Sequence, residues 1–228
     1  MPLSAWVYAN AVMPLRAIYL HGFASSPRSS KAAFLGRQLR AHGIDVRTPD
    51  LNLPDFSTLT VTRMVGETEG LIDASDEPLV LIGSSLGGFV AVNVAARWPS
   101  RVQYLVLLAP AVDFAAPLMR EFGQTAIDDW QRAGSVHVFH FGYGRMMPIH
   151  HDLYADARRY DALHARLPMP VIVFQGRHDT AVDPATVVAW CEARPHVQLH
   201  LLDDDHQLGS SLDDIWKKTA AFLQLTAR

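Results

Sequence analysis

Short apolar runs alternate along this chain with longer amphipathic stretches, and turn residues separate the two. The apolar runs with the length of a buried strand are Ala17–Leu20, Ile44–Arg47, Leu79–Ile82, Val102–Leu108, Val171–Gln175 and Val197–Leu202. The stretches with helical character are Lys31–His42, Thr60–Ala74, Leu86–Trp98, Pro184–Ala193 and Leu208–Leu225. Because crossover helices join parallel strands, this alternation predicts an α/β fold with a mostly parallel sheet flanked by helices.

The alternation stops between Pro110 and Leu167, where more than fifty residues separate two predicted strands. A connection of that length exceeds the about 12–15 residues beyond which structureless loops are uncommon. Its large apolar side chains are Phe114, Met119, Phe122, Trp130, Phe139, Phe141, Tyr143, Met146 and Met147. We expect residues 111–167 to fold as a helical insert, a lid over the sheet, within a single domain that spans residues 1–228.

The lid is expected to contribute to substrate binding. Phe139, Met146 and Met147 are the candidate contacts, because aromatic and methionine side chains suit an acyl chain. The same side chains could equally form the insert's own apolar core, and the pattern does not separate the two interpretations.

Composition excludes several classes of protein. Apolar residues make up 49% of the 228 residues and charged residues only 19%, which is unlike a disordered chain. The net charge is −3 without a long run of either sign, so neither nucleic acid nor an anionic membrane surface is an expected partner. The single cysteine, Cys191, rules out an intrachain disulfide and is expected to be buried in a helix. No apolar run approaches the about 18 residues of a membrane span.

The first residues could be mistaken for a targeting signal. Ala5–Val12 is apolar and contains an Ala-x-Ala pattern, but no Lys or Arg precedes it and the run is short. These features argue against a secretory signal, so a cytoplasmic protein with a small-molecule substrate is the expectation. Met13 could be an alternative start.

A candidate nucleophile lies where a predicted buried strand meets a helix. Gly83, Ser85 and Gly87 match the pattern Gly-x-Ser-x-Gly in the strand-turn-helix setting that the pattern requires. Glycines suit the flanking positions because side chains would clash in so sharp a turn. The turn would place the Ser85 hydroxyl at a helix N-terminus, where backbone N–H groups favour negative charge. Ser84 is expected to be a packed or hydrogen-bonded neighbour.

A serine hydroxyl needs a base and an orienting acid to become a nucleophile, and in folds with this turn the chain order is Ser, Asp or Glu, then His. Asp179 follows a predicted strand at the sheet edge where ligands bind, whereas Asp183 is better placed to cap the next helix. His206 follows the last strand at the same edge. His196 precedes that strand and His200 lies inside it.

These residues predict a mechanism. His206 would take the proton from Ser85, and Asp179 would orient the imidazole and stabilise its cation. Ser85 would form an acyl-enzyme that water then hydrolyses. The backbone N–H groups of Leu86 and Phe23 are the expected oxyanion donors, since the residue after the nucleophile and the loop after the first strand commonly supply them.

The motifs together resemble a known superfamily. The segments that carry the resemblance are Tyr19–Ala32, Gly83–Phe89, Gly176–Asp179 and Asp205–His206. They are similar to those of α/β-hydrolases, and the first resembles the signature of small bacterial esterases of the YqiA type. The resemblance covers about residues 17–225 and implies hydrolysis of a carboxylic ester or thioester without a cofactor. The insert is longer than in the shortest YqiA-like proteins, and the adjacent serines and lid are also similar to acyl-protein thioesterases.

Other functions would use similar residues. A non-catalytic binding protein of this fold usually lacks one of the three triad residues, whereas this chain has candidates for all three. Acyl transfer or cleavage of a carbon–carbon bond would use the same nucleophile and oxyanion donors, so the sequence leaves them open. His150, His151 and Asp152 lack the i, i+4 spacing of helical metal ligands, and no metal site is predicted. His21 is expected to hold its loop.

Overall fold

A computed structural model of the chain describes residues 15–225, without the side chains of residues 116–123. The predicted features Ala5–Val12 and Met13 lie outside the described residues, as do the side chains of Met119 and Phe122. The strands of the main sheet are β1 (Arg16–Leu20), β2 (Asp45–Arg47), β3 (Leu79–Ser84), β4 (Val102–Leu108), β7 (Val171–Gly176) and β8 (Val197–Leu202). They follow the order β2-β1-β3-β4-β7-β8, and every neighbouring pair is parallel.

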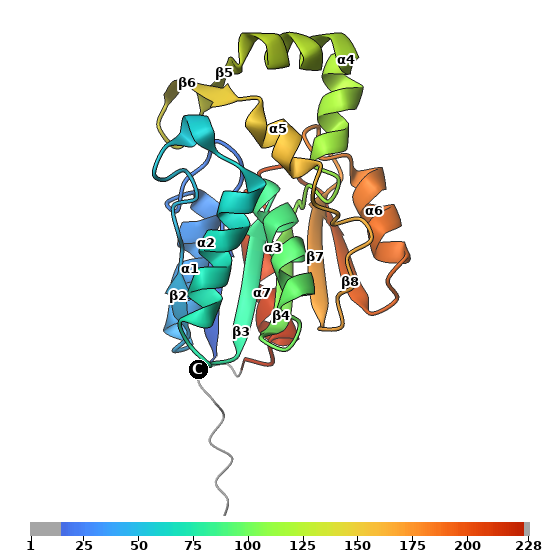
Figure 1. Cartoon of the computed structure of the whole chain (residues 1–228). Helices are drawn as coiled ribbons and strands as arrows, with labels where there is room; N and C mark the ends of the chain where they lie inside the picture. Colours follow the sequence, from blue (N-terminus) through green and yellow to red (C-terminus); the bar gives the residue numbers. More distant parts are fainter. Residues whose placement is uncertain (1–14, 226–228) are drawn as a thin grey trace, which may run out of the picture.

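Helices cover both faces of this sheet (Figure 1). They are α1 (Ser30–Ala41), α2 (Val61–Asp73), α3 (Leu86–Arg97), α6 (Pro184–Glu192) and α7 (Leu212–Phe222). Alternate side chains of each strand point to opposite faces. Ile18 and Leu20 of β1 pack in the apolar cluster that includes α2, α3 and α6, whereas Ala17 and Tyr19 pack in the cluster that includes α1 and α7. The sheet is therefore buried on both faces, as the near-continuous apolar runs predict.

Local sequence explains where several helices begin and end. The Ser29 hydroxyl accepts a hydrogen bond from the Ala32 N–H at the start of α1, and Gly43, with φ +80°, follows its end. The sequence predicts that the last helix begins at about Leu208, but residues 208–211 are not helical and α7 begins at Leu212. Cys191 is buried in α6, as predicted.

The insert is only partly helical, which corrects the prediction. It contains α4 (Ala115–Ala133), the antiparallel hairpin β5 (Ser135–His140) and β6 (Arg145–His150), and α5 (Asp152–Ala157). In β5 the side chains of Val136, Val138 and His140 are more buried than those of His137 and Phe139 between them. That alternation is the two-residue period of a strand, but the run is too short to stand out from its surroundings in the sequence. Glycines at both ends of β5 permit the chain reversals.

The hairpin lies against the loops at the carboxyl edge of the sheet (Figure 1). The Gly142 N–H donates to the Ala24 carbonyl at 3.2 Å, in the loop that follows β1. The ring of buried His140 meets the ring of Phe56, in the short helix η1 (Phe56–Thr58), edge to face at a centroid distance of 4.6 Å. The hairpin thus packs against the loop that follows β1 and against η1, which follows β2.

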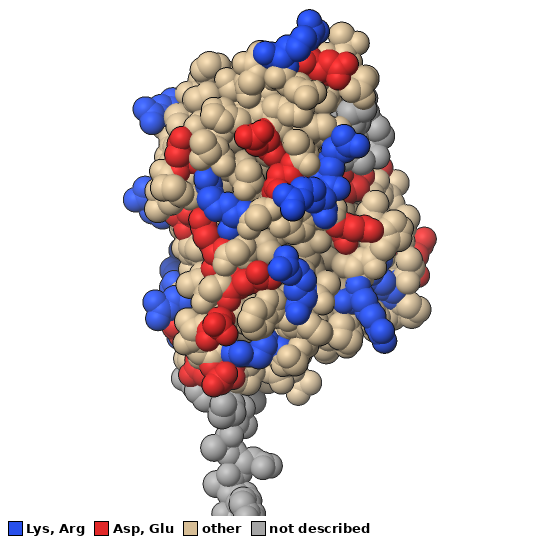
Figure 2. All heavy atoms as spheres, in the orientation of Figure 1, with Lys and Arg blue, Asp and Glu red and all other residues tan. Residues whose placement is uncertain are grey.

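Both ends of the described chain lie at the opposite edge of the sheet, where β1 begins and where α7 returns (Figure 1). On the face drawn in Figure 2, basic and acidic side chains are interspersed, so this face presents no broad area of one sign. None of the helices within residues 15–225 combines the length and the apolar character needed to span a bilayer.

Candidate active site

Ser85 occupies a strained turn between β3 and α3. Its backbone has φ +54° and ψ −120°, in a region that L-residues with a side chain rarely adopt. Hydrogen bonds hold the turn on both sides: the Ser85 N–H donates to Leu108 O at 3.0 Å, and Ser85 O accepts from the N–H groups of Gly88 and Ala111 at 2.8 and 3.2 Å. A residue held in such a conformation by its surroundings is typical of a functional site.

The glycines on either side of Ser85 allow this turn to lie close to its neighbours. A Cβ on Gly87 would lie 2.2 Å from the carbonyl oxygen of Leu20, and one on Gly83 would lie 2.4 Å from the Gly87 oxygen. Both distances are well inside van der Waals contact. The pattern Gly-x-Ser-x-Gly is therefore a packing requirement of α3 against β1 and β3.

The structure separates the two adjacent serines by exposure. Ser84 is 3% exposed at the end of β3, whereas Ser85 is half-buried. Burial of the Tyr19 hydroxyl raises its pKa, and hydrogen bonds with Ser84 and Ser29 oppose that shift. Ser84 is thus a hydrogen-bonded interior residue, and Ser85 is the serine that a substrate could reach.

His206 and Asp179 lie in hydrogen-bond contact, as the sequence predicts. His206 Nδ1 is 2.8 Å from Asp179 Oδ2. Asp179 comes from the loop after β7, and His206 comes from the loop after the neighbouring strand β8. Between these loops, a Cβ on Gly176 would lie 2.4 Å from Asp205 O, so glycine at this position lets the two loops approach. The described residues include no hydrogen bond between Ser85 and His206.

Asp179 is an ionised acceptor that several donors hold in place. Its Oδ1 accepts from the N–H groups of Ala181 and Val182 at 2.9 and 2.8 Å, and its Oδ2 also accepts from Gln175 Nε2 at 2.9 Å. Burial alone would raise the pKa of Asp179, but the hydrogen bonds and the charge of His206 lower that pKa below its ordinary value. Because ionised Asp179 accepts the hydrogen bond from His206, the proton of the neutral imidazole lies on Nδ1. The Nε2 atom is then able to accept a second proton.

The other candidates for acid and base have structural positions. The carboxylate of Asp183 caps α6 and accepts from the Ala185 N–H at 3.0 Å. His200 lies within β8 with its ring stacked on Phe174 at a centroid distance of 5.3 Å, and burial lowers its pKa. His196 is exposed just before that strand.

The two residues predicted to donate oxyanion N–H groups both lie close to the Ser85 turn. Leu86 is the first residue of α3, and Phe23 follows Gly22, on which a Cβ would lie 3.2 Å from the Ser85 Cβ. Among the described residues, neither N–H donates to another protein group. His21 holds this loop, as expected: its Nε2 accepts from the Leu51 N–H at 3.1 Å, so its Nδ1 donates to Gly22 O at 2.9 Å. Burial lowers the pKa of His21, which favours this neutral form.

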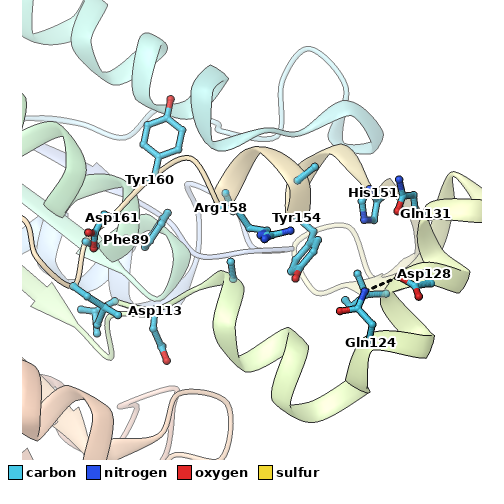
Figure 3. Close-up of a pocket in the computed structure, with 17 residues that line it drawn as sticks. Phe89, Asp113, Gln124, Asp128, Gln131, His151, Tyr154, Arg158, Tyr160 and Asp161 are labelled. Carbon is cyan, nitrogen blue, oxygen red and sulfur yellow. Dashed lines mark hydrogen bonds between the residues drawn. The ribbon is translucent and has the colours of Figure 1, made fainter.

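A cavity of about 720 Å³ lies between α3, α4 and α5 (Figure 3). Tyr154 projects from α5 toward α4, where Gln124 donates a hydrogen bond to Asp128. Arg158, which follows α5, lies over the Tyr154 ring at 5.8 Å from its centroid. One lining residue, Phe89, is close in the chain to the Ser85 turn, and its N–H donates to Ser85 O at 3.2 Å. Ser85, Asp179 and His206 are not among the lining residues, so the cavity does not enclose the candidate triad.

The predicted lid contacts lie elsewhere in the insert. Phe139 and Met146 face one another across the hairpin and are 47% and 55% exposed. Met147 is half-buried and packs against the apolar core. None of the three lines the cavity, so their contact with a substrate stays a prediction.

Two residues of the site were not predicted from the sequence. Gln175, the penultimate residue of β7, donates a hydrogen bond to Asp179. Its position at the strand end, four residues before Asp179 in the sequence, was the signal that could have identified it. Lys31 lies beside the His206 loop, which only the tertiary structure reveals. No cluster of three or more potential metal ligands occurs within the part of the chain that the structure describes.

Comparison with known proteins gives a family match over most of the chain. Residues 16–224 match the family described as "Uncharacterised protein family (UPF0227)". A curated relative, lipase LipV of Mycobacterium tuberculosis, is 33% identical over 115 residues. That match takes in 47% of this chain and 42% of the lipase, so it spans less than half of either protein.

Solved structures extend the similarity to the whole fold. Est1E from Butyrivibrio proteoclasticus with bound ferulic acid has a TM-score of 0.81 at 17% identity, covering 94% of this chain and 90% of its own. Mouse alpha/beta hydrolase domain-containing protein 10 has a TM-score of 0.77 at 20% identity, with 92% and 89% covered. A serine hydrolase without lid from Xanthomonas campestris has a TM-score of 0.66 at 20% identity, with 96% and 85% covered. Identities this low show a shared fold.

Proposed function

This chain belongs to the uncharacterised protein family UPF0227 and has the α/β-hydrolase fold, and we propose that it is a serine hydrolase that cleaves carboxylic esters or thioesters. The observation that carries the proposal is the backbone of Ser85, held at φ +54° at the start of α3. This geometry presents a hydroxyl at the edge of the sheet to which the loops of Asp179 and His206 also belong.

The proposed reaction begins with attack of Ser85 Oγ on the substrate carbonyl carbon. His206 Nε2 accepts the hydroxyl proton, and Asp179 stabilises the imidazolium that forms. The N–H groups of Leu86 and Phe23 would bind the oxyanion of the tetrahedral intermediate. His206 then protonates the leaving alcohol or thiol, and a water molecule, deprotonated by the same histidine, releases the acid from the acyl-enzyme.

The cavity beside the nucleophile turn is the proposed site for the acyl group. Its volume of about 720 Å³ falls in the range of about 300–1,000 Å³ typical of small-molecule sites. Apolar walls at Phe89, Val112 and Ile127 accompany polar groups such as Gln131 and Arg158. We therefore propose acyl groups of short to medium length. The name of the partial relative, a lipase, and the ferulic acid bound to Est1E support an ester substrate.

A fluorophosphonate probe with intact-mass detection tests this proposal. Such a probe reacts with an activated serine, so the wild-type protein should gain the mass of one label and Ser85→Ala should gain none. Ser84→Ala is the matched control and should still be labelled. Hydrolysis of p-nitrophenyl esters and acyl-CoA thioesters of rising chain length then identifies the substrate class. Labelling that persists in Ser85→Ala would overturn the assignment of the nucleophile.

A further inference from the structure

Lys31, in the first turn of α1, is buried beside the loop that carries His206. The residue is 7% exposed, and its Nζ donates a hydrogen bond to the carbonyl oxygen of His206 at 3.1 Å. Lysine is almost never buried unless it is paired, and the N-terminal turn of a helix disfavours a cation. Burial and the helix N-terminus thus both disfavour the ammonium group, and helix formation does not explain a lysine at this position.

Three carboxylates act electrostatically on this ammonium group. Asp179, Asp204 and Asp205 attract it electrostatically, and burial outweighs that attraction and lowers the pKa of Lys31 to about 8. Asp204 is itself 9% exposed, and its buried Oδ2 has no hydrogen-bond partner among the described residues. At neutral pH Lys31 is thus mostly charged and supplies a buried positive charge next to these carboxylates.

We propose that Lys31 is a positioning residue for the general base: its ammonium group ties the His206 loop to α1 and balances the carboxylates around the histidine, which keeps the imidazole in its working orientation. This inference rests on the proposed function of His206. Lys31 acts through the loop backbone and makes no contact with the reacting atoms.

The way in which His206 is held explains why a charge behind its loop matters. The only hydrogen bond of the imidazole within residues 15–225 is the one from Nδ1 to Asp179, so the orientation of the ring depends on where the loop backbone places it. The hydrogen bond from Lys31 fixes the backbone carbonyl of the same residue. Without the ammonium group, this hydrogen bond is lost and the negative charge of Asp179, Asp204 and Asp205 is no longer offset, so we expect the loop to shift. A displacement of about 1 Å at a catalytic group costs about 100-fold in rate.

Substitution of Lys31 tests the role. Lys31→Met keeps an unbranched side chain one atom shorter and removes its charge, and should lower kcat of p-nitrophenyl ester hydrolysis by about 10- to 100-fold with little change in KM. Lys31→Arg should recover most of this loss. Lys217→Met, the same change at an exposed lysine of α7, should leave kcat unchanged. Circular dichroism and thermal unfolding identify any variant that fails to fold.

The pH profile separates positioning from a purely structural role. Wild-type kcat should fall as the pH rises through about 8, because Lys31 then loses its proton. Lys31→Arg should extend activity to higher pH because a guanidinium stays charged. If kcat of the wild-type protein and kcat of Lys31→Arg fall over the same alkaline pH range, the proposal is contradicted.

A measurement without substrate keeps this test independent of hydrolysis. The proton shared by His206 Nδ1 and Asp179 should give a downfield proton NMR resonance, assigned by its loss in Asp179→Asn. In Lys31→Met it should shift or broaden, and in Lys31→Arg and Lys217→Met it should not. If no ester is cleaved by the wild-type protein, the proposed function fails while this arm still tests Lys31. An unchanged resonance and unchanged kcat in Lys31→Met would refute the role.

Discussion

The backbone of Ser85 is held by hydrogen bonds at its own N–H and carbonyl groups, and Asp179 accepts four hydrogen bonds through its two carboxylate oxygens. The imidazole of His206, in contrast, has a single hydrogen bond within the described part of the chain. The candidate nucleophile and the candidate acid are thus held by more hydrogen bonds than the candidate base. Substitutions around His206 should therefore affect turnover more than folding.

Asp179→Asn is expected to lower kcat/KM by about 1,000- to 10,000-fold, because the amide no longer selects the His206 tautomer with its proton on Nδ1. Measurement of ester hydrolysis together with the unfolding free energy separates lost chemistry from lost stability. Asp183→Asn is the matched control, since asparagine still caps α6 and Asp183 takes no part in the proposed reaction. Equal losses in the two variants would contradict the assignment of Asp179.

Asp179 should also make stability depend on pH in the acid range. Burial acts to raise its pKa, but hydrogen bonds and the His206 charge lower the folded pKa below the ordinary value of 3.8. A carboxylate with a lowered folded pKa stabilises the fold above its unfolded pKa and loses that effect as the pH falls through the folded value. The advantage of wild-type protein over Asp179→Asn in urea unfolding should therefore shrink below about pH 4. If the stability advantage of the wild-type protein instead grows as the pH falls, the predicted lowering of the Asp179 pKa is contradicted.

At the scale of elements, the approach of α3 to the sheet decides where the nucleophile lies. The N-terminus of α3 meets β1 at Gly87 and meets β3 at Gly83, without room for a side chain at either contact. Any atom added there has to push α3, and Ser85 with it, away from the strand ends. Stability and activity should therefore be lost together at these glycines.

Gly87→Ala is expected to lower the free energy of unfolding by about 1–3 kcal/mol or more, because the new Cβ would overlap a backbone carbonyl that cannot move alone. Gly66→Ala is the matched control. Gly66 lies in α2 with open space at its Cβ position, so alanine there should stabilise by about 0.4–1 kcal/mol. Chemical denaturation of both variants checks the difference, and a neutral Gly87→Ala would disprove the packing argument.

At the scale of the molecule, the cavity joins the insert to the sheet region, since its walls come from α3, α4, α5 and the adjoining loops (Figure 3). A ligand there would contact residues that are distant in sequence, such as Phe89 and Leu163. The size of the acyl group should thus depend on how α4 and α5 sit over the strand ends.

Ala155→Phe, which adds a ring to the cavity wall, should raise KM for medium-chain esters by about 10-fold or more and leave acetate esters nearly unaffected. Thr125→Phe adds the same ring at an exposed position of α4 that does not line the cavity, and should change neither KM. Kinetics with p-nitrophenyl esters of increasing length provide the comparison. If Ala155→Phe changes KM equally for short-chain and medium-chain esters, the cavity is not the site that binds the acyl group.

The α/β-hydrolase fold predicted from the sequence is confirmed by the sheet topology and by the structural relatives. Its central strands were predictable because β3 and β7 are almost wholly apolar runs. The contact between Asp179 and His206 followed from the strands that precede them. The hairpin of the insert was missed because its alternation spans only Val136 to His140. Lys31 was missed because its partner, His206, lies 175 residues away in sequence.

Because both ends of the described chain emerge where β1 begins and α7 returns, they leave the molecule on the side opposite Ser85 (Figure 1). A tether attached through either end would orient the candidate catalytic edge away from a solid support. Immobilised protein should thus keep open access for substrate. The same geometry would also let a fused protein follow the chain without shielding the site.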